Sequence, residues 1–376
     1  MRRNQSEKIL SDLKRKMVFL SGPRQVGKSW LARELTKSFD KPISLNWDNR
    51  QDKEIILRQA WPSDSDLLVF DEIHKMPDWK NYLKGVYDTK RSETAILVTG
   101  SARLETFRQS GDSLAGRYYH HRLLPICPAE AMQAGEQRDL AHFLERGGFP
   151  EPFLAEDAAE AGRWRRYYLD GLIREDILSF ENIRELRAMN LLVNLLRGRV
   201  ASPLSYQSLS EDIGVAPNTV KRYIEILEAL YIVFRVYPHN RSIARSLAQQ
   251  PKLYFFDTAL VENEGARLEN HVALSLLKEL YMREDADGIR RELRYLRTKE
   301  GRETDFLITV ENLPRLAVEV KANEREISPG LSYFCSRYDM KGLQLVGDLR
   351  LEYEQDGIEV RGAQRWLEGI GAHQEF

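Results

Sequence analysis

The chain has 376 residues, and because a single hydrophobic core stops growing at roughly 250 to 300 residues, we expect two or three domains. Hydrophobic residues make up 42% and charged residues 30%, a composition that excludes a disordered chain. No apolar run approaches the roughly 20 residues that cross a bilayer, so we expect a cytoplasmic protein without membrane association. The formal net charge of −1 gives no global attraction for nucleic acid, and the two cysteines exclude a disulfide framework.

A glycine-containing loop follows the first apolar run of the chain. Residues 16–20 read as a short strand, the segment Gly22–Ser29 fits the pattern GxxxxGK[ST] throughout, and a helical pattern begins at Trp30. Glycine is needed where the backbone turns tightly and brings its N–H groups against phosphate oxygens. The order of strand, loop and helix therefore predicts an ATP site, with Lys28 on the β and γ phosphates and the Ser29 hydroxyl on Mg²⁺. The expected nucleotide-binding residues are Gly22, Pro23, Arg24, Gln25, Val26, Gly27, Lys28, Ser29 and Trp30.

A second strand, residues 66–70, ends in two carboxylates, Asp71 and Glu72. An acidic pair after a strand is by itself a common solvated turn. Together with the glycine loop it predicts that Asp71 holds Mg²⁺ through water and that Glu72 is the general base that polarises the attacking water. The pair therefore indicates a Mg²⁺-dependent ATPase.

A third strand, residues 94–99, leads into Ser101, which we expect to bond the γ-phosphate or its water; Thr99 is the alternative. Further on, Arg117 is a candidate for the arginine that neutralises transition-state charge, supplied within the chain or by a neighbouring copy. Both observations also fit ordinary strand-end residues and a surface arginine. The catalytic set predicted from the sequence is Glu72, Lys28, Arg117 and Ser101.

The motifs GPRQVGKS, LLVFDEIHKMPDW, ILVTGSA, SLAGRYY and GGFPEP occur in this order along the chain. In that order they resemble the AAA+ superfamily ATPases of bacteria and archaea in which an ATPase domain precedes a domain of unknown function. The resemblance covers nearly the whole chain and implies an α/β sheet flanked by helices, with a small helical lid. His74 departs from the family pattern, where a glutamine is more usual, but it lies outside the two carboxylates.

The middle of the chain carries a helix-turn-helix pattern. Residues 205–213 read as a short helix that Gly214 ends, and residues 216–230 as a longer one. Strands are expected at 232–237 and 253–256, which together with the helices predicts a winged helix. Exposed basic residues of the second helix, Lys221 and Arg222, could meet DNA, or the module could serve only as an adaptor between domains.

The carboxyl-terminal third predicts an amphipathic helix at 268–280 and strands at 293–297, 304–308 and 316–321. Asp305 is followed 14 residues later by Glu319-x-Lys321, and the period of two places Glu319 and Lys321 on one face of their strand. This constellation resembles the PD-(D/E)xK nuclease core. The resemblance implies that a second metal ion binds to Asp305 and Glu319, that Glu269 could add a ligand and that Lys321 positions water. Because alternating Glu and Lys are common on strands, inherited architecture without cleavage stays open.

The sequence thus predicts an α/β protein with four parts, which are a P-loop ATPase domain at residues 1–145, a helical lid or linker at 146–200, a winged-helix-like domain at 201–260 and a nuclease-like domain at 261–376. The leading hypothesis is a Mg²⁺-dependent ATPase that couples its nucleotide state, ATP or ADP, to the carboxyl-terminal domain. One alternative is a nuclease, acting on DNA or another nucleic acid, that ATP regulates. The other is an adaptor that hydrolyses ATP slowly. The pattern leaves the oligomeric state open.

Overall fold

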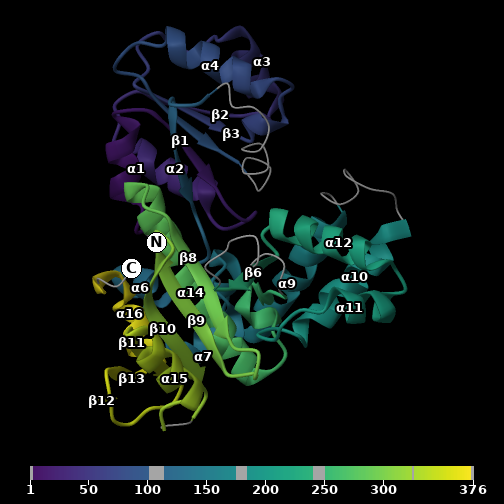
Figure 1. Ribbon diagram of the computed structural model, residues 1–376. Helices are drawn as coiled ribbons and strands as arrows, with labels where there is room; N and C mark the ends of the chain where they lie inside the picture. The colour runs from purple at the N-terminus through teal and green to yellow at the C-terminus, as the bar shows by residue number, and fades with distance from the viewer. Residues whose placement is uncertain (1–2, 101–113, 175–183, 240–249, 324–325, 374–376) are drawn as a thin grey trace. The chain divides into compact units, whose positions relative to one another are not determined.

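The computed structural model describes residues 3–100, 114–174, 184–239, 250–323 and 326–373 (Figure 1). The chain divides into two compact units, Met1–Leu124 and Pro125–Phe376. The four-part division stays a prediction, but the structure groups the chain differently. The unit boundary precedes residue 145, and strands on both sides of the expected boundary at 260 belong to one sheet.

The first unit is built on a five-stranded parallel sheet in the order β2-β3-β4-β1-β5. Its elements are α1 (Ser6–Leu13), β1 (Met17–Ser21), α2 (Lys28–Thr36), β2 (Pro42–Asn46), α3 (Arg50–Arg58), β3 (Leu67–Asp71), η1 (Ile73–Lys75), α4 (Trp79–Thr89), β4 (Ala95–Thr99) and β5 (Tyr118–Arg122). All five residues of β1 and of β4 are buried, which is typical of a parallel sheet with helices on both faces. The predicted α/β fold is confirmed.

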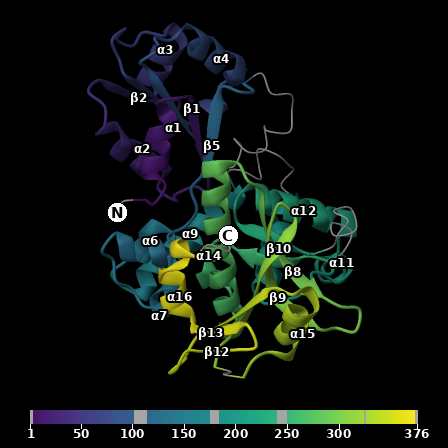
Figure 2. The same cartoon turned by 60° about the vertical axis from the view of Figure 1, so that its left-hand side comes forward.

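Side chains of the strands pack against helices on the two faces of the sheet. Phe19 and Phe70 pack with Ile56 of α3 and Leu83 of α4 in one cluster, while α1 contacts β1 and α2 contacts β3 and β4 (Figure 2). Burial of each such side chain contributes about 1.5–3 kcal/mol. Because the strands run parallel, the carboxyl ends of β1, β3 and β4 meet at one edge of the sheet, where loops gather polar residues.

The second unit combines helices with an eight-stranded mixed sheet in the order β12-β13-β11-β10-β9-β8-β6-β7. Its helices are α6 (Pro128–Gln133), α7 (Leu140–Arg146), α8 (Pro150–Leu154), α9 (Ala158–Leu172), α10 (Arg184–Arg197), α11 (Tyr206–Ile213), α12 (Pro217–Ala229), η4 (Thr258–Leu260), α14 (Glu264–Asp287), α15 (Pro329–Tyr338), α16 (Ala363–Glu368) and η5 (Ile370–Ala372). Its strands are β6 (Val233–Pro238), β7 (Lys252–Phe255), β8 (Arg291–Arg297), β9 (Glu303–Val310), β10 (Leu313–Lys321), β11 (Lys341–Val346), β12 (Tyr353–Gln355) and β13 (Ile358–Gly362).

The helix-turn-helix region contains the expected elements. Gly214 ends α11 in the left-handed conformation, with a φ of 75°, and α12 follows after two residues. The strands β6 and β7 pair antiparallel, but β6 also pairs in parallel with β8 through Tyr237 and Pro238. The hairpin therefore continues the carboxyl-terminal sheet, and a separate winged helix stays a prediction.

The long helix α14 corrects the expectation of an amphipathic helix at 268–280. It runs from Glu264 to Asp287, and Leu268 and every residue from Asn270 to Leu280 are buried. The physical reason is contact on several sides, because α14 contacts β7, β8 and β10 as well as α7 and α16. Across the described ranges, no helix combines the length and the apolar character that crossing a membrane requires.

Candidate functional site

The loop between β1 and α2 is shaped by two glycines. Gly22 has a φ of +147°, and a Cβ at this position would lie 2.1 Å from the carbonyl oxygen of Leu123. Gly27 has a φ of +99°, in the left-handed region. A side chain at Gly22 would collide with backbone and one at Gly27 would strain it, so the loop needs both glycines of the GxxxxGKS pattern.

Lys28, the first residue of α2, turns back into this loop. Its buried Nζ donates hydrogen bonds to the carbonyl oxygens of Gly22 (3.0 Å) and Pro23 (2.6 Å). Burial lowers the pKa of Lys28 to about 8. The ammonium thus lies beside the amino terminus of a helix, where the free N–H groups and the helix dipole favour an anion.

Ser29 and Asp71 meet across the carboxyl edge of the sheet. The Ser29 hydroxyl donates to Asp71 Oδ2 at 2.8 Å, and the Asn46 side-chain amide lies 3.4 Å from the same oxygen. Thr99, considered for the γ-phosphate, donates its hydroxyl hydrogen to Asp71 Oδ1. A hydroxyl and a carboxylate in this arrangement suit Mg²⁺, which favours oxygen ligands, so the residues fit the ion expected with ATP.

Glu72 lies immediately after the strand in a left-handed conformation, with a φ of 56°. Burial raises the pKa of its carboxyl group. Its Oε2 atom lies 3.3 Å from the ammonium of Lys75, which also forms an ion pair with Asp48. Neither Lys75 nor Asp48 was predicted to belong to the site. Lys75 follows Glu72 by three residues in the sequence, and this closeness could have drawn attention to it.

The segment before α1 braces the loop from outside the motif. The buried guanidinium of Arg3 donates to the carbonyl oxygens of Val26 (2.8 Å) and Leu124, and the side-chain amide of Gln5 donates to the carbonyl oxygen of Arg122 (2.9 Å). The sequence gives no sign of this role, because a charged amino terminus usually faces water.

The remaining predicted residues of this site separate in the structure. Ser101 lies outside the described residues. Trp30 is 39% exposed on the first turn of α2. Arg117 precedes β5 beside the first residue of β1, at the opposite edge of the sheet from the loop and therefore about 15 Å away along the strand. There it forms a two-point ion pair with Asp88, with distances of 2.9 and 3.1 Å. The within-chain role of Arg117 is thus not supported by its position; supply to a neighbouring copy stays a prediction.

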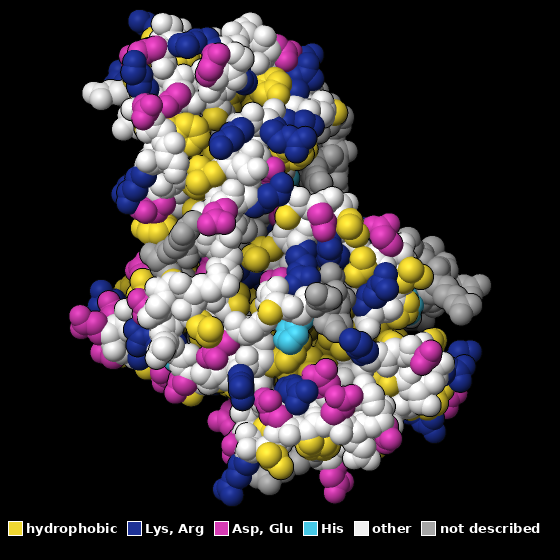
Figure 3. Space-filling model, turned by 90° about the vertical axis from the view of Figure 1, so that its left-hand side faces the viewer, with side chains coloured by type: hydrophobic (Ala, Val, Ile, Leu, Met, Phe, Trp, Pro, Cys, Tyr) yellow, Lys and Arg dark blue, Asp and Glu magenta, His cyan; other side chains and the backbone are white. Residues whose placement is uncertain are grey.

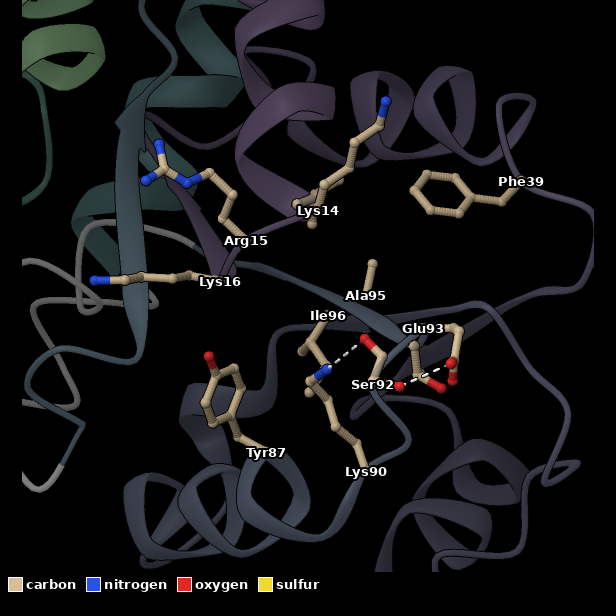
Figure 4. Close-up of a pocket in the computed structure, with 12 residues that line it drawn as sticks. Lys14, Arg15, Lys16, Phe39, Tyr87, Lys90, Ser92, Glu93, Ala95 and Ile96 are labelled. Carbon is tan, nitrogen blue, oxygen red and sulfur yellow. Dashed lines mark hydrogen bonds between the residues drawn. The ribbon is translucent and has the colours of Figure 1, made fainter.

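A cavity of about 270 Å³ also lies at this amino edge of the sheet (Figure 4). It is lined by the residues before β1, among them Lys14, and by the residues around the start of β4, among them Lys90 and Ala95. The Lys90 ammonium donates to the carbonyl oxygen of Ser92 at 3.5 Å. Because no residue of the Gly22–Ser29 loop lines this cavity, it is distinct from the candidate nucleotide site.

The second predicted site lies in the other unit, where β9, β10 and α14 bring their carboxylates close together. Asp305 Oδ2 accepts a hydrogen bond from the backbone N–H of Val320 (2.9 Å), and Lys321 lies 3.2 Å from Glu319 Oε1, as expected for one face of a strand. Burial, followed by the charge of Asp305, raises the pKa of Glu269 and of Glu319. Asp305 therefore lies close enough to influence the charge of both glutamates.

A buried lysine that was not predicted lies among these carboxylates. Lys252 Nζ is 2.8 Å from Glu303 Oε1, 3.2 Å from Glu269 Oε1 and 3.3 Å from Asp305 Oδ1. Although burial lowers its pKa, the carboxylates raise it more, so the lysine stays charged. Its position in a separate predicted module, 53 residues before Asp305, hid this contact.

The carboxylates do not fit the second metal ion. One observation favours an ion, because Glu319 Oε2 is buried without a hydrogen-bond partner among the described residues. Against it, the ammonium of Lys252 already lies between the oxygens of Glu269, Glu303 and Asp305, and within the described ranges no three acidic, histidine or cysteine side chains are arranged to hold a metal. The predicted ligand set Glu269, Asp305 and Glu319 therefore stays a prediction, and the position of Lys252 argues against it.

The exposed side of α12 carries Lys221 and Arg222, while Val220, Tyr223 and Ile224 are buried. On the face in Figure 3, basic and acidic side chains are interspersed, in agreement with a formal net charge of −1.

Three family models match successive parts of the chain. Residues 14–132 match a family described as an AAA domain, residues 137–267 a domain of unknown function, DUF8612, and residues 264–362 another domain of unknown function, DUF4143. The first of these matches supports an AAA-type ATPase. The other two assign no activity, and a nuclease is not among their descriptions.

Relatives in bacteria and archaea share most of the chain. An uncharacterized protein of Mycobacterium tuberculosis is 25% identical over 328 residues, which cover 84% of this chain and 72% of the relative. An uncharacterized protein of Methanocaldococcus jannaschii is 26% identical over 322 residues, which cover 78% of this chain and 69% of the relative.

Solved structures are similar at a greater distance. A Walker-type ATPase of Pyrococcus abyssi has a TM-score of 0.45 and 15% identity, covering 69% of this chain and 94% of that one. A RuvB variant of Thermotoga maritima has a TM-score of 0.32 and 15% identity, covering 62% of this chain and 89% of that one.

Proposed function

We propose that the first unit binds ATP with Mg²⁺ and hydrolyses it, and that the nucleotide state controls the second unit. One observation carries the proposal: a buried Lys28 ammonium inside a glycine loop at a helix amino terminus, one residue before a Ser29 hydroxyl that lies 2.8 Å from Asp71. The segment after β1 carries Lys28 and Ser29, and the end of β3 carries Asp71; both lie at the carboxyl edge of one parallel sheet. The match of this region to an AAA domain supports the same function.

Each residue has a role in this proposal. The loop N–H groups and Lys28 bind the phosphates, and Lys28 exchanges its hydrogen bonds with the loop carbonyls for bonds to phosphate oxygens. Ser29 and Asp71 would hold Mg²⁺, which neutralises charge that develops on the transferred phosphoryl group. Glu72 accepts the proton of the attacking water. The raised pKa of Glu72 favours this role, because a stronger base takes the proton more readily.

A slowly hydrolysing switch is the second candidate function. It is favoured by the ion pair of Glu72 with Lys75, 3.3 Å apart, because a base held by an ammonium is less available to water. The module that receives the nucleotide signal would be the helix-turn-helix region, whose exposed Lys221 and Arg222 suit nucleic acid. Regulation of a nuclease by ATP is disfavoured by Lys252 within the carboxylates of the second unit.

Calorimetric ATP binding and steady-state turnover test the proposal on three variants. Lys28→Ala should weaken ATP binding by roughly 10- to 100-fold, because charge-assisted hydrogen bonds to phosphate are lost. Glu72→Gln should bind ATP like the wild type but turn it over at least about 100-fold more slowly. Glu54→Gln, exposed on α3, is the matched control and should leave both unchanged.

The outcomes separate the two candidates. If Lys28→Ala binds ATP as tightly as the wild type, the nucleotide site is elsewhere. If the wild type binds ATP but turns it over no faster than Glu72→Gln, the chain is a nucleotide-dependent switch and Glu72 is not used as a base.

A further inference from the structure

Lys252 is the first residue of β7 and is 1% exposed. Its three partners come from two other elements, Glu269 from α14 and Glu303 and Asp305 from β9. An ammonium has three hydrogens to donate, and three carboxylates lie within 3.3 Å of its nitrogen. The hydrogen-bonding capacity of the lysine is therefore matched by its surroundings.

The carboxylate oxygens are also engaged by neutral groups. The buried Tyr254 hydroxyl donates to Glu269 Oε1 at 2.7 Å, and the second oxygen of Asp305 accepts the N–H of Val320. Two oxygens that face the cluster, one from Glu269 and one from Asp305, thus contact the same ammonium. A carboxylate pair of this kind repels itself unless a cation lies between the oxygens.

A divalent ion cannot share this position with the ammonium. Mg²⁺ binds carboxylate oxygens at about 2.0–2.1 Å and requires near-octahedral oxygen ligands. An ion on the Glu269 and Asp305 oxygens would lie within a few ångströms of Lys252 Nζ, where two positive charges in a buried site repel strongly. The lysine would have to leave, and its side chain is enclosed by protein, including the ring of Tyr295 at 5.6 Å.

We propose that the Lys252 ammonium is the resident cation of the Glu269, Glu303 and Asp305 carboxylates and takes the place that a divalent ion would need on the Asp305 oxygen. The unit therefore binds no divalent metal at Asp305 and does not cleave nucleic acid through this cluster. Instead, Lys252 ties β7, which follows the helix-turn-helix region, to α14 and β9. This inference concerns the second unit and does not depend on ATP hydrolysis by the first.

Metal-dependent thermal stability of the full chain tests it. The background is Lys28→Ala, which removes the effect of nucleotide carried through purification. Melting is measured in EDTA and in Mn²⁺ at millimolar concentration. In this background Mn²⁺ should leave the melting temperature unchanged. Adding Lys252→Ala should lower the melting temperature in EDTA and create a Mn²⁺-dependent rise of a few degrees, because the uncompensated carboxylates then bind the ion by mass action.

Further variants assign the effect to the cluster. Adding Asp305→Asn to Lys252→Ala should remove the Mn²⁺-dependent rise, whereas adding Glu354→Gln, exposed on β12, should leave it intact. Lys252→Met keeps the volume of the side chain and should show the same gain if the alanine variant fails to fold.

Three results would overturn the proposal. The first is a Mn²⁺-dependent rise with Lys252 present that Asp305→Asn or Glu319→Gln abolishes. The second is the absence of any gain in both Lys252 variants. The third is cleavage of single- or double-stranded DNA or RNA in Mg²⁺ or Mn²⁺ by the protein with Lys252 present, lost in Asp305→Asn.

Discussion

At the scale of single residues, the protonation state of Lys28 in the nucleotide-free protein affects the free energy of ATP binding. Its ammonium is buried and bonded to two loop carbonyls, and burial lowers its pKa to about 8. Phosphate oxygens in the same place would favour the charged form and raise the pKa. If Lys28 binds the phosphates as proposed, we expect its proton uptake to be coupled to ATP binding near pH 8.

This coupling predicts that ATP affinity falls as pH rises above about 8, by up to about tenfold per pH unit, because the free lysine must then take up a proton. Below pH 8 the lysine is already charged and the affinity levels off. Titration calorimetry at pH 8.5 in buffers of different ionisation enthalpy should report net proton uptake. Lys28→Arg, whose guanidinium stays protonated, should lose the uptake while retaining some binding. Equal uptake in both proteins would place the titrating group elsewhere.

The site residues that could be predicted are those that form a recognisable motif within one short segment of the sequence. Gly22, Lys28 and Ser29 lie within eight residues, and their spacing alone indicates a phosphate loop. Arg3 and Lys252 could not be predicted, because their partners lie 121 and 53 residues away in the sequence, at Leu124 and Asp305. Contacts over such separations depend on the tertiary fold, which periodicity does not reveal.

At the scale of elements, a buried ion pair fastens α6 to α14. Lys278 bonds to Glu130, both with side chains about 2% exposed or less, and also donates to the carbonyl oxygen of Pro125 at 2.8 Å. Buried pairs of this kind contribute little over an apolar pair, but breaking one leaves a charge without compensation. The pair thus makes the packing of α6 sensitive to single substitutions.

We therefore expect Lys278→Met to lower the free energy of unfolding of the second unit by about 3–5 kcal/mol, because Glu130 is left buried and charged. The double variant Lys278→Met with Glu130→Met should recover at least half of this loss. Urea unfolding followed by circular dichroism measures both. A double variant as unstable as the sum of the two single variants would mean that the two side chains act independently.

The second unit shows why helices and strands were easier to predict than the way they pack together. The strands at 293–297, 304–308 and 316–321 and the helix starting near Glu269 all exist, each somewhat longer than expected, because local apolar patterns define them. The number of faces that α14 buries does not follow from its pattern, since Lys278 and Glu279 are polar yet buried by α6 and other neighbours. Burial of polar residues through specific partners is invisible to hydrophobic periodicity.

At the scale of the whole molecule, the chain joins an AAA-type unit to a unit whose sheet runs from the helix-turn-helix hairpin into the carboxyl-terminal core. The α/β class of the first unit could be predicted, because strands alternating with helices leave few arrangements. The parallel pairing of β6 with β8 could not, because it joins segments 57 residues apart at Tyr237 and Arg294. The strands that follow the helix-turn-helix region and the strands of the carboxyl-terminal core therefore belong to one continuous sheet.

Nucleic-acid binding by that region gives the last prediction. With a formal net charge of −1, affinity for DNA must come from a few basic residues, and Lys221 and Arg222 lie exposed on α12. Changing both to Glu should weaken DNA binding at least about tenfold and reduce the slope of log affinity against log salt by about 2, because two phosphate contacts are lost.

The matched control changes Arg33 and Lys84, exposed on α2 and α4, to Glu. It alters net charge equally but should leave the slope in place. Fluorescence anisotropy with a labelled duplex between 50 and 200 mM salt, about the range in which such contacts matter most, measures both. If the wild-type protein shows no affinity for DNA even at low salt, the helix-turn-helix region acts as an adaptor between units, and the nucleotide signal ends in a protein contact.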